Sequence, residues 1–335
     1  MKVLFHAYNT CFQNASGGVQ VRIRRMKNLL TERGLQVDFF NPYETNIRDY
    51  DVLHIFMLNS ETAGLIAAAK SAGVKVVLSS IVSLNKPQWW RKWIGMRVPI
   101  QTEYKQKQKI IDLSDAIIAE TPAEANFINQ EYRKSICQIF VIPNGMDELG
   151  PGSDEIYGII DRNKKYALQV GRFDENKNQL NVIRALRGAE YDVVFVGGTG
   201  LNGPTHYYDS CLEAAKGYDN IHLLGWIESN TPLLNSAFHN AHAVILPSHH
   251  ETFGLVATEG AAAGAHVCIS NTLAINGFNV FKKEHTYNPD DIPEMRRVID
   301  HVMATPKDNA LKERAKEVFN WEKIVAEHIN IYNSL

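Results

Sequence analysis

Short apolar segments rich in β-branched residues alternate along this chain with longer segments whose apolar residues recur every three or four positions. Such alternation predicts parallel α/β units. In the first half, the segments that predict strands are Lys2–His6, Gln36–Phe40, Val52–Phe56, Lys75–Ser79, Ala116–Ala119 and Gln138–Ile142. In the second half they are Tyr166–Val170, Val193–Val196, Ile221–Leu223, Ala243–Leu246 and His266–Ile269.

Helical periodicity covers Val19–Arg33, which Gly34 closes with a C-cap signal, and Glu61–Ser71, which ends near Gly73. Gly145–Lys165 is rich in turn residues and lacks a helical period, which predicts a linker. We therefore predict an α/β protein with two doubly wound, Rossmann-like parallel sheets facing a central cleft, and ligands at the carboxyl ends of the strands. The predicted domains are 1–148 and 166–320, joined by a linker over 149–165.

Composition limits the classes of partner. The 335 residues suit two domains, and a net charge of −2 gives no basic field for nucleic acid. The first residues predict a strand and not a signal peptide, and no apolar run reaches the ~18 residues that span a bilayer. We expect a cytoplasmic protein that meets any membrane from its surface. Four scattered cysteines, which we expect to be reduced thiols, show no metal-ligand spacing: Cys11, Cys137, Cys211 and Cys268.

The segment with the most specific pattern runs from Pro247 to Glu259, P-S-H-H-E-T-F-G-L-V-A-T-E, between an apolar strand and a helix of small residues. Free backbone N–H groups and the helix dipole make such a helix start an anion site. Glu251 lies in the loop and Glu259 more than a turn inside the helix, so the two face different parts of one ligand. The ordinary alternative is one Glu favoured by the dipole and one solvated on a helix face.

A second segment, Val170-Gly171-Arg172-Phe173-Asp174-Glu175-Asn176-Lys177-Asn178, follows the first strand of the second half. Gly171 permits a tight turn. Arg172 and Lys177 supply the fixed positive charge that a leaving diphosphate needs in the transition state. The alternative is a solvated loop with a surface pair between Glu175 and Lys177.

Together these segments resemble retaining glycosyltransferases of family 4, which have the GT-B fold. The run from Pro247 to Gly264 is similar to the family's E-x(7)-E signature, and V-G-R-x-x-x-x-K-N to its phosphate-binding segment. Three positions depart from the family pattern, where Gly, Ala and Pro are usual: Thr252, Gly260 and Ala265.

Four shorter runs extend the resemblance. Ile142–Asp147 is similar to the I-P-N-G-h-D run that closes the family's first domain, and Val196–Gly200 to the V-G-x-G turn near the nucleotide. Ser16–Val19 resembles the family's glycine loop, whereas the G-x-G-x-x-G fingerprint of dinucleotide-binding oxidoreductases is absent. Asn320–Lys323 is similar to the start of the closing helix, which implies that 321–335 returns to the first domain.

The resemblance implies retaining transfer of a sugar from a nucleotide diphosphate sugar, UDP favoured, to a hydroxyl of a glycan or lipid-linked acceptor, in polysaccharide or glycolipid synthesis. No cofactor or metal is required, and the motif region has no Asp-x-Asp cluster. Arg172 and Lys177 would neutralise the diphosphate, Glu251 would orient the sugar and Glu259 would hold the ribose. The remaining expected donor contacts are Gly17, Gly18, Gly197, Phe253, Gly254, Leu255 and Val256.

One position departs from the pattern in the first domain. Relatives carry His in a V-x-x-x-H-D run after the fourth strand, and Ile81 stands here, so His-assisted recognition of the sugar or acceptor is in doubt. His54 lies in the third strand, Val52–Phe56, where it either faces the cleft or is structural.

The segment Lys86–Lys109 contrasts with the near-neutral chain. It carries seven basic residues against one acidic residue, Glu103, with Trp89, Trp90 and Trp93 among them. Basic residues with tryptophan suit an anionic membrane surface, and the alternative is an acceptor-site lid with a solvated basic face.

Two further functions remain open. One is a nucleotide-sugar epimerase on the same scaffold, which needs its own catalytic acids and bases. The other is a non-catalytic subunit or glycan-binding partner, in which the motif residues should have been lost. Arg172, Lys177, Glu251 and Glu259 are all present.

Overall fold

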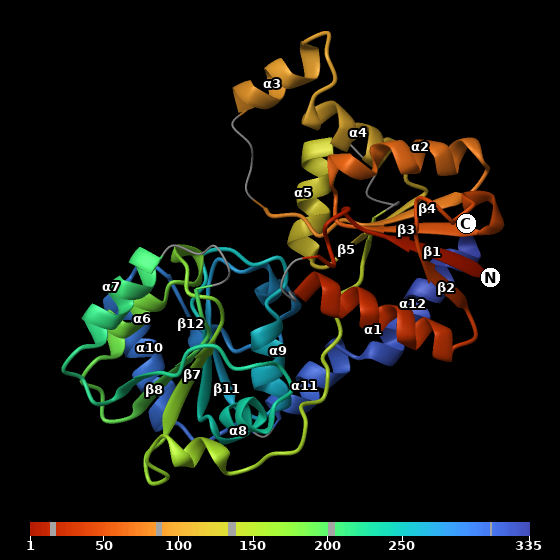
Figure 1. Cartoon of the computed structure of the whole chain (residues 1–335). Helices are drawn as coiled ribbons and strands as arrows, with labels where there is room; N and C mark the ends of the chain where they lie inside the picture. The colour runs from red at the N-terminus through yellow and green to blue at the C-terminus, as the bar shows by residue number, and fades with distance from the viewer. Residues whose placement is uncertain (14–17, 85–88, 133–138, 200–204, 309) are drawn as a thin grey trace. The chain divides into compact units, whose positions relative to one another are not determined.

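The computed structural model describes residues 1–13, 18–84, 89–132, 139–199, 205–308 and 310–335. The chain divides into two compact units (Figure 1). Unit 1 comprises Met1–Asn144 with Trp321–Leu335, and unit 2 comprises Gly145–Asn320. Each contains a six-stranded sheet, and all the strand pairs are parallel.

The sheet of unit 1 has the order β2-β1-β3-β4-β5-β6. Its strands are β1 (Lys2–His6), β2 (Gln36–Phe39), β3 (Val52–Phe56), β4 (Lys75–Ser79), β5 (Ala116–Ala119) and β6 (Ile139–Val141). Its helices are α1 (Gly18–Glu32), α2 (Ala63–Ser71), α3 (Trp89–Arg97), α4 (Glu103–Leu113), α5 (Pro122–Tyr132) and α12 (Trp321–Ser334), with 3-10 turns at Ile47–Asp49 and Ser60–Thr62.

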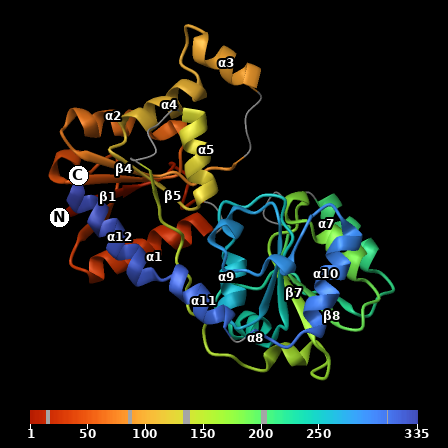
Figure 2. The same ribbon diagram turned by 180° about the vertical axis from the view of Figure 1, so that it is seen from behind.

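Helices cover both faces of this sheet. Helices α1 and α12 pack on one face, and α2, α4 and α5 on the other (Figures 1 and 2). Burial on both sides explains why β3 reads V-L-H-I-F without polar alternation, and all five of its residues are buried. The last segment of the chain therefore completes the core of the first unit.

The sheet of unit 2 has the order β12-β11-β10-β7-β8-β9. Its strands are β7 (Tyr166–Val170), β8 (Asp192–Val196), β9 (Ile221–Leu223), β10 (Ala243–Leu246), β11 (His266–Ser270) and β12 (Thr286–Tyr287). The helices are α6 (Gln179–Leu186), α7 (Thr205–Ala215), α8 (Pro232–Asn240), α9 (Leu255–Ala262), α10 (Ile292–Ala304) and α11 (Leu311–Val318), with 3-10 turns at Glu155–Gly158, Glu175–Lys177, Ala274–Phe278 and Lys283–His285.

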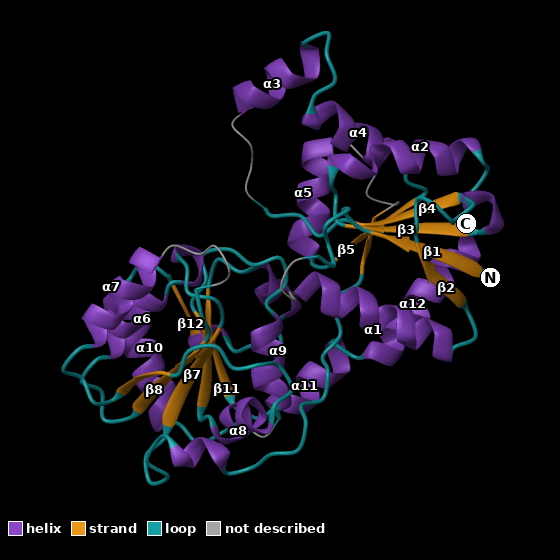
Figure 3. Cartoon of the chain, in the orientation of Figure 1, coloured by secondary structure: helices purple, strands orange, loops and turns teal. Residues whose placement is uncertain are grey.

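Unit 2 is also doubly wound (Figure 3). Helices α6, α7 and α10 pack on one face of its sheet, and α8, α9 and α11 on the other. The strand order is that of the Rossmann fold, with the reversal between β7 and β10, which are neighbours. A crevice at the carboxyl ends of β7 and β10 is the expected ligand position.

The predicted fold class, two Rossmann-like parallel sheets, is confirmed. A cleft between the units stays a prediction. Strand β12 went unpredicted because its two residues are too short for a pattern. The expected linker belongs to unit 2, whose first residue is Gly145, because Ile156 and Ile160 pack beneath α8. Residue Gln138, at the start of the last predicted strand of unit 1, lies outside the described residues.

Buried imidazoles lie in both units. In unit 1, Tyr332 Oη and Ser79 Oγ hydrogen-bond the ring of His54 at 2.6 and 2.9 Å, and the ring of His328 lies 5.8 Å from it. Burial lowers the pKa of His328 to about 4, an effect that the nearby Arg22 reinforces. In unit 2, burial with the nearby His266 and Lys282 lowers the pKa of His285 to about 4. These rings are neutral in the folded protein at neutral pH.

We predict that His328→Gln makes the stability of the chain less sensitive to acid. Below pH 6.5 His328 is protonated in the unfolded state, whereas in the folded state it stays neutral down to about pH 4. The contribution of the neutral ring to the free energy of unfolding is therefore complete above pH 6.5 and is lost as pH falls. The loss is about 2 kcal/mol between pH 6.5 and 5. Urea denaturation of wild type and variant at several pH values measures this difference. His206→Gln, at an exposed ring on α7, is the control, and equal pH dependence in wild type and His328→Gln would contradict the prediction.

Among the described residues, no helix has both the length and the apolar character needed to cross a bilayer.

Candidate functional site

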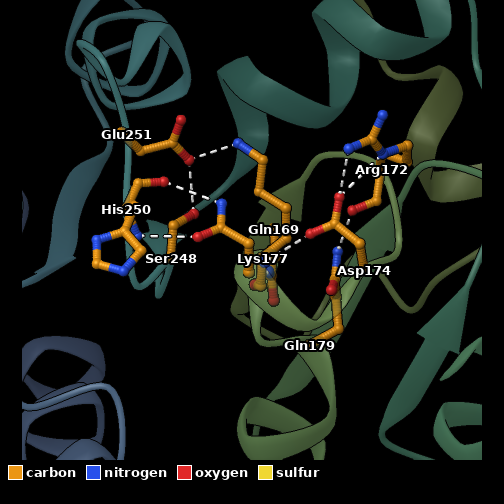
Figure 4. Close-up of polar contacts among 9 residues, drawn as sticks. Gln169, Arg172, Asp174, Lys177, Gln179, Ser248, His250 and Glu251 are labelled. Atoms are coloured by element: carbon orange, nitrogen blue, oxygen red, sulfur yellow. Dashed lines mark hydrogen bonds and ion pairs between the residues drawn. The ribbon is translucent and has the colours of Figure 1, made fainter. Parts of the chain in front are cut away.

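Two loops meet where the strand order of unit 2 reverses. The loop after β7 carries Arg172 and Lys177, and the loop after β10 carries Ser248 and Glu251 (Figure 4). Because β7 and β10 are parallel neighbours, both loops leave the same edge of the sheet. The two segments that the sequence analysis singled out are therefore side by side.

A network of hydrogen bonds sets the conformation of the loop after β7. Asp174 accepts from Arg172 Nε and Nη2 at 2.9 and 2.7 Å, and from the backbone N–H of Lys177 at 2.9 Å. Gln179 Nε2 donates to the carbonyl oxygen of Arg172 at 2.8 Å. The side chain of Arg172 is 63% exposed, so its guanidinium is held near the edge of the sheet and still open to solvent.

An ion pair joins the two loops. Lys177 Nζ contacts Oε1 of Glu251, and Ser248 Oγ donates to the same oxygen at 2.6 Å (Figure 4). Within the described part of the chain, Oε2 of Glu251 accepts no hydrogen bond. One oxygen thus fixes the carboxylate, and the other remains available to a ligand.

Asparagine side chains hold the loops in register. The backbone of Asn176 accepts from His249 N at 2.9 Å, and its side chain donates to His250 O at 2.9 Å and accepts from His250 N at 3.0 Å. Asn178 has a φ of 59° and donates to Pro247 O at 3.3 Å and Pro289 O at 2.8 Å. Sequence reasoning missed these residues and Ser248, although all of them lie within the quoted motifs.

Helix α9 begins at this same edge. Gly254, its N-cap, has a φ of 104°, which favours glycine. Among the described residues, the N–H groups of Leu255 and Val256 have no acceptor, as expected in a first helical turn. The side chain of Phe253 is buried against Phe278 and Phe319, so the loop presents its backbone and not its ring.

Glu259 lies one turn into α9 and is half-buried. Burial, with the carboxylate of Asp147 nearby, raises the pKa of Glu259 to about 7. Its carboxylate accepts no hydrogen bond from the residues that the structure describes. Glu259 therefore has free capacity to accept hydrogen bonds.

Two glycines allow close packing around the site. Gly197 follows β8 with a φ of 148°, and a Cβ there would overlap the carbonyl oxygen of Gly171. Gly260 packs α9 on β10, where an added Cβ would lie 2.7 Å from Cβ of Val244. These glycines bring the loop after β8 and helix α9 against the site.

The predicted site residues of the first half occupy unit 1. Gly18 begins α1, and Gly17 lies outside the described residues, so their part in a donor site stays a prediction. His54 is fully buried in the core. Ile81 is 4% exposed, and its side chain packs in the core on the α1 face of the sheet.

Metal ions can be considered from the donor set. Among the described residues, no group of three or more His, Cys, Asp or Glu side chains is placed to hold one. The described cysteines, Cys11, Cys211 and Cys268, are buried free thiols, and Cys137 lies outside the described residues.

Comparison with solved structures matches the fold of the whole chain. A sucrose-phosphate synthase from Thermosynechococcus elongatus covers 99% of this chain and 98% of its own, with a TM-score of 0.76 and 17% identity. Anabaena Alr3699/HepE, in complex with UDP, covers 100% of both chains with a TM-score of 0.75 and 15% identity. The fold of this chain is the two-domain GT-B fold.

Sequence relatives point to the same class. A D-inositol 3-phosphate glycosyltransferase of Arthrobacter sp. (strain FB24) is 31% identical over 230 residues, which span 65% of this chain and 53% of that protein. A protein of the same name from Paenarthrobacter aurescens (strain TC1) is 24% identical over 344 residues, which span 96% of this chain and 82% of that protein. The family model described as "Glycosyl transferases group 1" matches residues 157–318. The site described above therefore lies in a domain of the group 1 glycosyl transferase family.

Proposed function

We propose that this chain is a retaining glycosyltransferase, which moves a sugar from a nucleotide diphosphate sugar to an acceptor hydroxyl of a glycan or glycolipid. One observation carries the proposal. Arg172, Lys177 and the unbonded N–H groups at the start of α9 converge on the switch point of a Rossmann-like sheet. Fixed cations and a helix start together suit a diphosphate that leaves with increasing negative charge.

Each side chain has a distinct proposed role. Arg172 and Lys177 neutralise the diphosphate, together with the backbone of Gly254–Val256. Both cations are paired with acids, Asp174 and Glu251. A donor diphosphate competes for Lys177, and the released Glu251, still bonded to Ser248, orients the donor sugar. Glu259 accepts hydrogen bonds from the ribose hydroxyls.

UDP is the nucleotide that we favour. The Anabaena structure of the same fold contains UDP, and a related structure of that protein contains UDP-glucose. A thermal-shift screen of UDP, GDP, ADP and their sugar conjugates, with and without Mg²⁺, tests the proposal. A ligand at a hundredfold excess over its dissociation constant stabilises the folded state by about 2.7 kcal/mol. No shift with any nucleotide at millimolar concentration would argue for a non-catalytic subunit.

We predict that Glu259→Ala removes the preference for a ribose 2′-hydroxyl. Wild type should bind UDP about tenfold more tightly than 2′-deoxy-UDP, because a hydrogen bond to a charged group contributes about 1.5–3 kcal/mol. The ratio of affinities should fall towards one in the variant, as measured by calorimetry.

The pH dependence of that ratio is a second readout. Both ligands carry the same diphosphate, so the titration of the phosphates cancels. With a pKa of about 7, Glu259 gains its charge as pH rises, and the wild-type ratio should rise between pH 6 and 8. An identical ratio in wild type and Glu259→Ala would contradict the ribose assignment while leaving UDP binding itself established.

For Lys177→Met we predict loss of the affinity contributed by the second phosphate. Wild type should bind UDP more tightly than UMP. In the variant the ratio of UDP affinity to UMP affinity should be lower by about tenfold or more, because one charge-assisted contact to the second phosphate is removed. Calorimetric titration with both nucleotides measures it. Lys216→Met is the matched control, since Lys216 lies before β9 at the amino edge of the sheet and pairs at the surface with Glu213. An unchanged UDP to UMP ratio in Lys177→Met would refute the role.

We also propose that α3 of unit 1 docks on an anionic membrane surface. Its exposed apolar side chains and those just after it are Trp90, Trp93, Ile94, Met96 and Ile100, each between 37% and 65% exposed. Arg91 and Arg97 lie over the rings of Trp90 and Trp93, at 5.2 and 4.3 Å. Indoles with adjacent guanidinium groups suit the headgroup layer of anionic lipid. Lys86 lies outside the described residues.

The docking proposal predicts binding to phosphatidylglycerol-containing vesicles, weakened by salt and weaker on phosphatidylcholine alone. Trp90→Ser with Trp93→Ser should reduce binding by about tenfold or more, because each indole loses its burial in the interface. Co-sedimentation measures this. Trp226→Ser is the matched control, since Trp226 is 64% exposed in unit 2. Equal binding of the double variant and wild type, or no binding to anionic vesicles, would overturn the proposal.

A further inference from the structure

The turn after β4 has a backbone conformation that its residue does not favour. Ile81 has a φ of 43°, in the left-handed region that β-branched residues rarely adopt. Such a conformation is strained and persists where its surroundings impose it. The buried side chain of Ile81 fixes one side of the turn in the core.

A single buried carboxylate, that of Glu124 on α5, fixes the other side. Its Oε1 accepts from Ser80 Oγ at 2.7 Å and from Val82 N at 2.9 Å, the residues immediately before and after Ile81. Its Oε2 accepts from the backbone N–H of Glu120 at 2.7 Å. Glu124 is 2% exposed, so water does not substitute for these bonds. The turn after β4 and the turn after β5 are therefore joined through one side chain.

The turn after β3 rests on this same assembly. Leu58 N donates to the carbonyl oxygen of Ser80, and Met57 N to that of Ser79, both at 2.8 Å. Asn59 N donates to the carbonyl oxygen of Met57 at 2.9 Å, which closes a γ-turn centred on Leu58, and Met57 itself has a φ of 78°. Three neighbouring strands thus share one hydrogen-bonded edge at their carboxyl ends.

The bonds depend on the charge of Glu124. Both backbone groups at its oxygens are donors, so a protonated carboxyl can place its hydrogen towards Ser80 Oγ alone. Ser80 Oγ has another acceptor, the carbonyl oxygen of Ile118 at 3.1 Å, to which its own hydrogen can turn. Protonation therefore reverses the bond between Ser80 and Glu124 and weakens the bond from Val82 N, which then meets a hydroxyl oxygen.

Several titratable groups face this carboxylate. Burial raises the pKa of Glu124 to about 7, against the opposing effects of the Ser80 and Val82 hydrogen bonds and of Arg22 on α1. Arg22 is itself buried and ion-paired with Glu120. His54 on β3 and His328 and Tyr332 on α12 surround Arg22, and both histidines are neutral at neutral pH because burial lowers their pKa.

We propose that Glu124 is a positioning residue: its ionised carboxylate holds the Ile81 turn in the left-handed conformation and so sets the shape of the carboxyl edge of unit 1. If the proposed function holds, on which this step rests, this edge is the surface that an acceptor contacts. The clamp itself, defined as the bonds of Glu124 to Ser80, Val82 and Glu120, does not depend on transferase activity.

Residue-resolved hydrogen exchange tests the clamp without donor or acceptor. In Glu124→Gln the amide places its NH₂ group against backbone donors, and the protection factors of the Val82 and Leu58 amides should fall by about tenfold or more. Glu131→Gln is the matched control, since Glu131 lies on the same helix and pairs with Lys92. The amide of Gly171 in unit 2, which donates to Val196 O, should be unchanged.

A pH profile separates a charged clamp from a merely structural side chain. After correction for intrinsic exchange, wild-type protection of Val82 should fall from pH 8 to pH 6, and this dependence should be absent in Glu124→Gln. The wild-type profile also serves if the variant does not fold. Unchanged protection in Glu124→Gln, or a flat wild-type profile, would overturn the proposal. The UDP affinity of the same proteins reports on unit 2 independently. If the wild-type protein does not bind UDP, the proposed transferase function is refuted, but the clamp is not.

Discussion

The pairing of β10 with β7 is the constraint on which the candidate site depends. These strands are distant in the sequence and pair in parallel at the centre of the sheet. The strands that follow β7 lie on one side of the pair, and those that follow β10 lie on the other. Two loops and a helix start must then share one edge. Arg172 and Lys177 come from the first loop, Glu251 and α9 from the second, and the asparagines at 176 and 178 keep the loops in register. Without that pairing the same motifs would be unrelated surface segments.

Charge in the site is balanced internally. Arg172 and Lys177 each have a carboxylate partner, so neither charge is left unpaired. Glu251 is held by a neutral hydroxyl as well as by Lys177, so under the proposed function the carboxylate would keep its place if the lysine bound a phosphate. Glu259 differs, because its neighbour Asp147 is another acid and burial favours its protonated form. The two glutamates of one motif thus have unlike environments, as expected of groups with unlike tasks.

Much of this could be predicted from the sequence. Eleven of the strands follow from short apolar runs with their centres in the right place, and the two doubly wound units follow from their alternation with helices. The two motif segments follow neighbouring parallel strands, and Lys177 of the first forms an ion pair with Glu251 of the second. The two-residue strand β12 carries too little pattern to be predicted. The stretch before β7 has the composition of a linker because only a few of its residues, such as Ile156 and Ile160, are buried in the core of unit 2.

The Glu124 clamp was out of reach for a different reason. Ser80 and Val82 lie 44 and 42 positions from Glu124 in the sequence, and no pattern in the sequence predicts a left-handed isoleucine between them. Gly260 is a simpler case, because its lack of a side chain lets α9 approach β10 until the branched Cβ of Val244 occupies the space that a methyl group would need. Where alanine stands at this helix position, as in the usual family pattern, the strand should carry a smaller residue opposite it. The side-chain volumes at positions 244 and 260 are thus expected to covary among related sequences. A larger residue on the helix should be matched by a smaller residue on the strand, so that the distance between α9 and β10 stays the same.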